Sequence, residues 1–207
     1  MCGSLDDQAW RGTRNVPVRP LGIELRTHAP RNADLYRATL GDLPGLTISE
    51  GPLLDACAHD AVIAPTNSFG YLDGGVDQAF AMRFGPRLQR ALQSRIAEEH
   101  EGELPVGEAA IVATGDFLLP FLVAAPATRL PGSISVEPLL FSAMTAAFRA
   151  IARWNAADEG PMIENVVLPD IARMIPGWQP DRLVLQLREA IEAWNDVRRG
   201  GGRAQAA

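Results

Sequence analysis

The sequence predicts a single α/β domain in which helices cover both faces of a central sheet. Short apolar segments bounded by Gly and Pro alternate with longer segments of helical periodicity, an order typical of three-layer α/β/α sandwiches. Of the 207 residues, 47% are hydrophobic, which is enough for one sizeable core. No internal repeat or interdomain linker is present. We therefore expect one domain over residues 20–198, preceded by an irregular N-terminal arm at residues 1–19.

The first half of the domain is expected to supply three strands and the helices that connect them. Asn32 can cap a short helix that continues to about Leu40. A helix over Val76–Phe84 is followed by Gly85-Pro86, which must interrupt or kink it. Because proline is favoured at a first helical position, a new helix starts there and runs to about Glu99. The expected strands, the last of them apolar and central, are Leu21–Thr27, Leu46–Glu50 and Ala61–Pro65.

The second half of the domain adds three short strands and two long helices. Residues Glu137–Trp154 carry an apolar stripe at helical spacing, which core packing explains better than a ligand role. The last helix, Asp181–Val197, also has one apolar face. Residues 199–207 are Gly, Arg and Ala for the most part, without periodicity, and should form a disordered tail. The expected strands are Ala109–Ala113, Phe121–Ala125 and Ile163–Leu168.

Charge and composition exclude several classes of function. The net charge is −6 and no basic run occurs, which argues against nucleic-acid binding because phosphate neutralisation needs clustered cations. All 19 basic residues are arginine, so Schiff-base or general-base chemistry by lysine is impossible. No apolar run reaches membrane-spanning length, and residues 1–19 lack the apolar stretch of a signal peptide. With two cysteines suited to a reduced compartment, we expect a cytoplasmic protein.

The histidines do not predict a metal centre. His28, His59 and His100 are scattered along the chain without the spacing that metal sites use. Surface or helix-capping positions are the simpler interpretation. We therefore expect neither a metal nor another cofactor.

A polar turn and a glycine turn follow the central apolar strand. The strand ends in Asn67, and Gly74-Gly75 precede a helix that opens with Asp77. Backbone N–H groups in a glycine turn at a helix N-terminus point outward together, and the helix dipole adds partial positive charge. The junction therefore predicts an anion and ribose site, at the carboxyl end of a strand, where α/β sheets bind ligands. Its other expected lining residues are Ser68, Phe69, Gly70, Asp73 and Val76.

Four segments occur in a characteristic order: Ala64-Pro65-Thr66-Asn67, Gly74-Gly75-Val76-Asp77, Phe84-Gly85-Pro86 and Leu104-Pro105-Val106-Gly107-Glu108-Ala109. From about residue 45 to residue 197, the chain resembles the macrodomain family of ADP-ribose-binding modules. The spacing of ten positions between Asn67 and Asp77 is far more specific than a lone glycine motif. The Asn-Ser-Phe-Gly loop is most similar to phage-tail-like and bacterial Appr-1″-p-processing members. The resemblance implies a mixed central sheet.

The resemblance also implies roles for two side chains. In hydrolytic members, the residue matching Asn67 hydrogen-bonds the distal ribose, and the residue matching Asp77 orients or activates a water molecule. Local chemistry is compatible with these roles, since a glycosidic bond to ribose breaks through an oxocarbenium-like state that a carboxylate can stabilise. An amide fixes the sugar without adding charge. The implied ligand is ADP-ribose-like, or an ADP-ribosylated substrate.

Simpler interpretations of the same residues stay open. Asp77 can be an early-turn carboxylate favoured by the helix dipole, and Asn67 can be an ordinary turn former. Asp73, which replaces a glycine usual in the family turn, is either a solvent-exposed turn residue or a second polar group at the pocket mouth.

The chain departs from the family pattern at two places. A second glycine-rich loop normally wraps the diphosphate, but here Val166-Val167-Leu168 is followed by Pro169–Trp178, a shortened loop without those glycines. Arg173 is a candidate guanidinium clamp on phosphate there, and equally a surface arginine lying across helices. The adenine-binding Asp of the family is replaced by Glu50-Gly51-Pro52-Leu53, where Glu50 or Asp55 are possible substitutes.

Three hypotheses for function follow. The first is a hydrolase of ADP-ribose derivatives, favoured by Asn67 and Asp77. The second is an enzyme of a specialised bacterial pathway that takes a smaller ribosyl or nucleotide substrate, favoured by the altered loop Pro169–Trp178. The third is a non-catalytic ligand-binding or phage-related module that keeps the fold.

Overall fold

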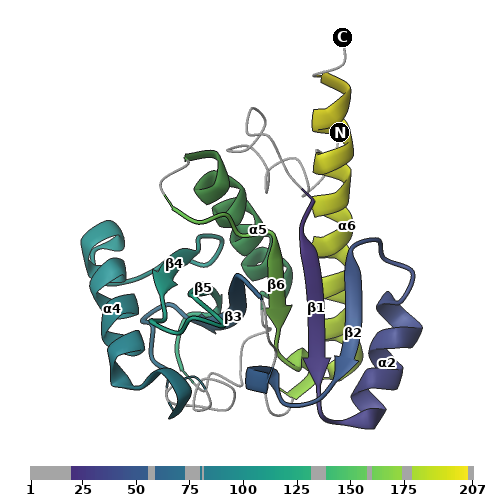
Figure 1. The fold of residues 1–207 in the computed structure, drawn as a ribbon, viewed down its shortest axis with the longest axis horizontal. Helices are drawn as coiled ribbons and strands as arrows, with labels where there is room; N and C mark the ends of the chain where they lie inside the picture. The colour runs from purple at the N-terminus through teal and green to yellow at the C-terminus, as the bar shows by residue number, and fades with distance from the viewer. Residues whose placement is uncertain are drawn as a thin grey trace.

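The computed structural model describes residues 20–55, 59–72, 80, 82–131, 139–157, 160–173 and 179–204. Within these ranges the strands form one six-stranded sheet in the order β2-β1-β6-β3-β5-β4 (Figure 1). All neighbouring strands pair in parallel except β4, which is antiparallel to β5. The strands are β1 (Gly22–Thr27), β2 (Leu46–Glu50), β3 (Ala61–Asn67), β4 (Ala110–Ala113), β5 (Phe121–Thr128) and β6 (Asn165–Leu168).

Helices pack on both faces of this sheet. Helices α2 (Pro30–Leu40), α5 (Leu140–Ala157) and α6 (Pro180–Ala204) share one apolar cluster with the strands, whereas α4 (Pro86–His100) belongs to a second cluster on the other face (Figure 1). Strand β3 alternates between the two clusters, since Ala61 and Ile63 belong to the first and Val62 and Ala64 to the second. This double burial explains its continuous apolar run, and the predicted three-layer α/β/α fold is confirmed.

Strand β5 extends further than predicted, whereas β3 ends at Asn67, the polar residue expected to end it. Strand β3 continues through Pro65 to Asn67, and β5 continues through Pro126 to Thr128. Proline weakens a strand prediction because it lacks a backbone donor. Here the ends of the two strands pair with each other in parallel, with Asn67 opposite Thr128 after a register shift. The polar Asn67 side chain is thus placed at the end of a rigid strand.

The start of α2 differs from the prediction. The helix begins at Pro30, with Ala29 as its N-cap residue, so Asn32 lies inside the first turn. Proline at a first helical position is preorganised for the helix, and this preference outweighs the capping preference of asparagine. The Asn32 amide donates to the Asp170 carboxylate instead.

Helix α6 also differs, because it continues to Ala204, past Val197 and into the segment expected to lack regular structure. An ion pair between Arg199 and Asp196, three positions apart, lies in this extension, where pairs at this spacing support a helix. The expected helix Val76–Phe84 lies partly outside the described residues, and its described positions, Phe80 and 82–84, are helical. None of the described helices combines the length and the apolar character needed to cross a bilayer.

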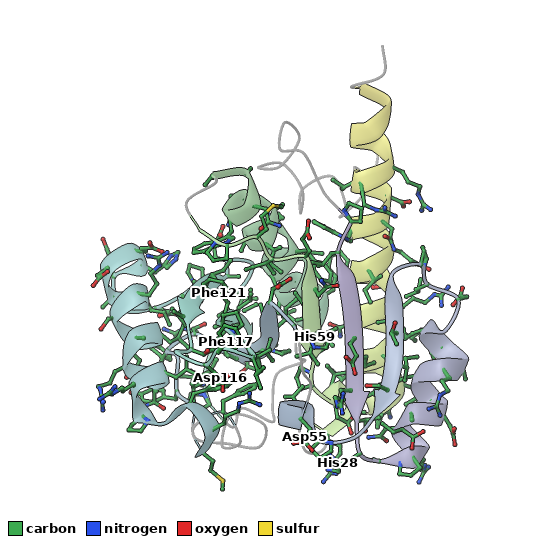
Figure 2. All side chains as sticks on the ribbon, in the orientation of Figure 1. His28, Asp55, His59, Asp116, Phe117 and Phe121 are labelled. Atoms are coloured by element: carbon green, nitrogen blue, oxygen red, sulfur yellow. The ribbon has the colours of Figure 1, made fainter. Side chains whose placement is uncertain are left out.

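Replacing Phe148 in α5 by alanine should destabilise the protein strongly. Its side chain is fully buried and its ring centroid lies 5.4 Å from that of Trp194 in α6, so truncation leaves a cavity and costs about 3–5 kcal/mol of unfolding free energy. Phe117, labelled in Figure 2 and 96% exposed, is the matched control, for which alanine should change stability by less than about 0.5 kcal/mol. Urea unfolding measures both; equal losses would contradict this packing.

Candidate functional site

The carboxyl ends of four adjacent strands meet at one edge of the sheet. Strands β1, β6, β3 and β5 are mutually parallel, so the chain leaves all of them at the same edge. Thr27 ends β1, Asn67 ends β3 and Thr128 ends β5, while Asp170 lies two residues beyond the end of β6. In open α/β sheets this edge is where ligands bind, which makes it the candidate site.

Asn67 organises the loop that follows β3. The residue is buried, with 6% of its surface exposed. The Oδ1 atom accepts the backbone N–H groups of Phe69 at 3.0 Å and Tyr71 at 3.3 Å, and Nδ2 donates to the Tyr71 carbonyl at 2.8 Å. The amide therefore closes a turn around itself, as expected of a turn former. One of its two N–H groups is used in this way.

The backbone of Ser68 joins the loop to the neighbouring segments. Its N–H donates to the Arg129 carbonyl at 3.1 Å, and its carbonyl accepts the Leu104 N–H at 2.8 Å. The Arg129 guanidinium lies 5.8 Å from the centroid of the Phe69 ring, within cation–π range. It also donates twice to the Glu103 carboxylate, at 2.6 and 2.8 Å, and these hydrogen bonds lower the pKa of Glu103. Contacts with Arg129, the residue that follows β5, thus fix the position of the loop after β3.

Gly70 allows the same loop to lie directly on α4. Its φ angle is +66°, in the left-handed region that favours glycine. A Cβ atom at this position would stand 2.9 Å from Ile96 Cδ1 and 3.0 Å from Leu92 Cγ. The side chain of Gln89, one turn before Leu92 in α4, accepts the Leu72 N–H at 2.8 Å. Gly70 is therefore explained by backbone conformation and close packing.

The predicted glycine turn and carboxylate lie outside the described residues. This holds for Asp73, Gly74, Gly75, Val76 and Asp77. The structure describes the residues up to Leu72 and then again Phe80, which is helical. The roles assigned to these five residues remain predictions.

A buried carboxylate at the end of β6 was not anticipated from the sequence. Asp170 is 6% exposed, and its Oδ2 accepts the Thr27 hydroxyl at 2.5 Å while its Oδ1 accepts the Tyr36 hydroxyl at 2.5 Å. Asn32 Nδ2 lies 3.0 Å from both oxygens. The Tyr36 oxygen in turn accepts the Ala172 N–H at 2.9 Å. We call Thr27, Asn32, Tyr36 and Asp170 the Asp170 network.

The Asp170 network fixes the segment that stands where a second phosphate loop was expected. Residues Ile171–Arg173 form a single 3₁₀ turn, and the Arg173 N–H donates to the Asp170 carbonyl at 3.0 Å. Burial, followed by the hydrogen bond to Asp170, raises the pKa of Tyr36 far above its ordinary value. The phenol therefore stays protonated and remains a donor. A polar residue just beyond a buried strand was the only sequence signal for this network.

Arg173 lies beside a histidine at the same edge. Its Nη1 stands 3.1 Å from Nε2 of His28, the residue that follows β1. Figure 2 shows His28 and Asp55 at the lower edge of the molecule, where the arrowhead of β1 ends. Asp55 is exposed in a 3₁₀ turn, while Glu50 accepts a hydrogen bond from Arg37 at 2.6 Å. Glu50, one of the candidate substitutes for an adenine-binding Asp, is thus paired with an arginine.

The other histidines have structural surroundings. His59 Nε2 lies 2.8 Å from Oε2 of Glu24, a β1 residue, and His100 lies in the last turn of α4, where a cation is favoured by the helix dipole. Within the described ranges, no group of three or more His, Cys, Asp and Glu residues is placed to hold a metal ion.

Comparisons with known proteins agree with this architecture. A sequence model of the family described as Macro domain matches residues 63–184, which is more than half of the 207-residue chain. None of the curated proteins is similar enough in sequence to match. Among solved structures, the macrodomain of DarG from Mycobacterium tuberculosis superposes with a TM-score of 0.54 at 19% identity, over 70% of this chain and 89% of that one. At that identity the likeness shows the fold.

A second solved structure is a macrodomain of Oceanobacillus iheyensis with ADP. Its TM-score is 0.49 at 15% identity, and the match covers 75% of this chain and 88% of that chain.

Gly70→Ala should destabilise the protein more than Gly115→Ala. Both glycines have positive φ angles, +66° and +79°, but a Cβ at Gly115 would meet nothing within 4 Å. The control therefore measures backbone strain alone, about 1–2 kcal/mol, whereas Gly70→Ala adds about 1–3 kcal/mol of overpacking against α4. Thermal and urea unfolding give the difference. A Gly70 variant as stable as the Gly115 variant would show that the loop does not pack on α4 in this way.

Alkaline pH should destabilise the folded protein through Tyr36. Its pKa is raised in the folded state, so the folded protein holds this proton more tightly than the unfolded chain does. The contribution is present below about pH 10 and is lost above it, by about 1.4 kcal/mol per pH unit. The absence of lysine removes the usual competing titration. Urea unfolding from pH 9 to 11.5 checks this, and Tyr36→Phe should flatten the slope; an unchanged slope would contradict it.

Proposed function

Because this chain belongs to the Macro domain family, we propose that it binds an ADP-ribose derivative or a related ribosyl compound and hydrolyses the bond at the distal ribose. The observation that carries the proposal is the buried Asn67 at the carboxyl end of β3, inside the matched residues. The ligand is a small molecule, or an ADP-ribosyl group on a larger substrate. Its ribose lies at the end of β3, beside the loop Ser68–Leu72.

Asn67 supplies the sugar contact in this proposal. Its carbonyl oxygen and one N–H group hold the turn, and the second N–H group donates to a hydroxyl of the distal ribose. Because the side chain is fixed by the turn before any ligand arrives, little conformational entropy is lost on binding. Ser68, Phe69 and Gly70 form the wall of the pocket through their backbone.

Asp77 supplies the chemistry in this proposal. The carboxylate orients a water molecule, whose oxygen forms a bond to the anomeric carbon while Asp77 accepts its proton. The leaving group departs with the electron pair of the broken glycosidic bond and takes up a proton. Backbone N–H groups of Gly74, Gly75 and Val76 bind the adjacent phosphate, and Asp73 lies at the mouth of the pocket.

A smaller ribosyl substrate is the alternative that a specific observation favours. Residues 169–173 contain no glycine, and Ile171–Arg173 form a 3₁₀ turn fixed by the Asp170 network. Backbone cradles for a diphosphate generally need residues without side chains. A ligand with one phosphate, or with a diphosphate held by other groups, meets this condition. The native member of this class would come from a specialised bacterial pathway.

Asp77→Ala should slow turnover strongly while leaving the fold intact. General-base catalysis contributes about 10²- to 10⁴-fold to rate, so hydrolysis of an ADP-ribosylated substrate should fall by that factor. Asp196→Ala, in the C-terminal half of α6, removes an exposed carboxylate as the matched control and should keep full activity. Calorimetric titration with ADP-ribose runs in parallel. Tight binding by the wild type supports the proposal, whereas wild-type protein that neither binds ADP-ribose nor responds to a panel of ribosides in thermal shift contradicts it.

Asn67→Asp tests the ribose contact proposed for this side chain. The carboxylate keeps the acceptor for Phe69 and Tyr71 but loses both N–H donors. We expect ligand affinity to fall about tenfold, equivalent to one lost hydrogen bond of about 1.4 kcal/mol, with the melting temperature as the control for the loop. Unchanged affinity would remove Asn67 from the ribose contact.

A further inference from the structure

We propose that Arg173, positioned by His28 and the Asp170 network, forms a side-chain anion subsite that takes a phosphate group of the ribosyl ligand. The proposal rests on the proposed function and adds to it how the phosphate is recognised. It assigns Arg173 as the binding residue, and His28 and Asp170 as positioning residues.

The subsite lies within reach of Asn67. His28 follows β1 and Arg173 follows β6, while Asn67 ends β3. Strand β6 lies between β1 and β3, so the ends of β1 and β3 are two strand spacings apart, about 10 Å. A pentose with one or two phosphates bridges that distance. A ligand whose sugar contacts Asn67 therefore brings its phosphate to the ends of β6 and β1.

The surroundings of Arg173 differ from those of several other arginines among the described residues. Arg83, Arg129 and Arg188 each donate to a carboxylate, with nitrogen to oxygen distances of 2.9, 2.6 and 2.7 Å. In the described part of the chain, the only side chain that Arg173 contacts by hydrogen bond or ion pair is His28. Since guanidinium can only donate, Nε2 of His28 is the acceptor in this contact. Among the described residues, Arg173 forms no ion pair with a carboxylate.

The backbone under Arg173 is held rigidly. Asp170 accepts hydrogen bonds from Thr27, Asn32 and Tyr36, and the Tyr36 oxygen accepts the Ala172 N–H. The turn that carries Arg173 is therefore tied to the end of β1 and the first turn of α2. A preorganised guanidinium loses less side-chain entropy on binding phosphate than a mobile one.

Side-chain recognition also agrees with the sequence of the turn. Residues 169–173 contain no glycine, so their backbone cannot approach a phosphate as a glycine loop does. A planar guanidinium binds phosphate through two parallel hydrogen bonds instead. The Arg173 side chain thus supplies the hydrogen-bond donors to phosphate that the backbone of a glycine loop would otherwise supply.

Arg173→Gln tests the binding residue, with Arg153→Gln as its control. Arg153 is an exposed arginine near the end of α5, the helix that leads from the carboxyl end of β5 back to the amino end of β6, so it lies at the opposite edge. Calorimetry with ADP-ribose, ribose 5-phosphate and unphosphorylated ribose measures each variant. Arg173→Gln should weaken binding of the phosphorylated ligands about tenfold to a hundredfold, as expected for a charged hydrogen bond. Affinity for ribose, and all affinities of Arg153→Gln, should not change.

His28 and Asp170 are tested by rescue. His28→Ala removes the acceptor for Arg173, whereas His28→Gln keeps an acceptor oxygen, so the glutamine variant should recover phosphate affinity that the alanine variant loses. Asp170→Asn should lower the ratio of phosphorylated to unphosphorylated ligand affinity, a quantity that a purely structural loss would not alter. A constant ratio in both His28→Ala and Asp170→Asn overturns the positioning roles.

The outcomes also separate this inference from the proposed function. ADP-ribose binding that is equal in wild type, Arg173→Gln and Arg153→Gln overturns the subsite and leaves the function standing. Binding of ribose 5-phosphate without ADP-ribose, if it depends on Arg173, supports the subsite and overturns the ADP-ribose assignment. Wild-type protein that binds no phosphorylated ligand overturns both.

Discussion

Parallel pairing of β1, β6, β3 and β5 brings four chain exits to one edge of the sheet. Each exit carries a polar residue whose side-chain hydrogen bonds the strand itself cannot supply. Two of these residues find their partners in different ways. Asn67 closes a turn with its own loop, whereas Asp170 collects donors from β1 and α2. The candidate site lies between Asn67 and Asp170. Its geometry therefore follows from how buried polar groups at strand ends find partners.

Much of the fold could be predicted because its signals are local. The apolar run of β3 and the helical stripe of α5 are readable from the chain alone, and they gave the correct layers. Local signals failed where tertiary contacts decided the outcome. Pairing with β3 carries β5 past Pro126 to Thr128, and Asn32 donates to Asp170 instead of capping α2.

The Asn67 side of the candidate site could be predicted from the sequence, whereas the Asp170 side could not. Asn67 and the loop after it are adjacent in sequence, so spacing and family resemblance both pointed to them. The Asp170 network joins residues between 134 and 143 positions apart, and no periodicity connects them. His28 is exposed, as expected of a surface histidine, but its contact with Arg173 spans 145 positions and was not predicted. Contacts between residues so far apart in the sequence can be recognised only when the order of the strands in the sheet is known.

The hydrogen bond from the Ala172 amide to the Tyr36 phenol has a further consequence for motion. An amide bonded to a side chain of another element exchanges its hydrogen with solvent only when that contact opens. Deuterium uptake at Ala172 therefore reports excursions of the turn after β6 separately from unfolding of the sheet. Occupation of the neighbouring edge by a ligand would slow that uptake without any change in the average conformation.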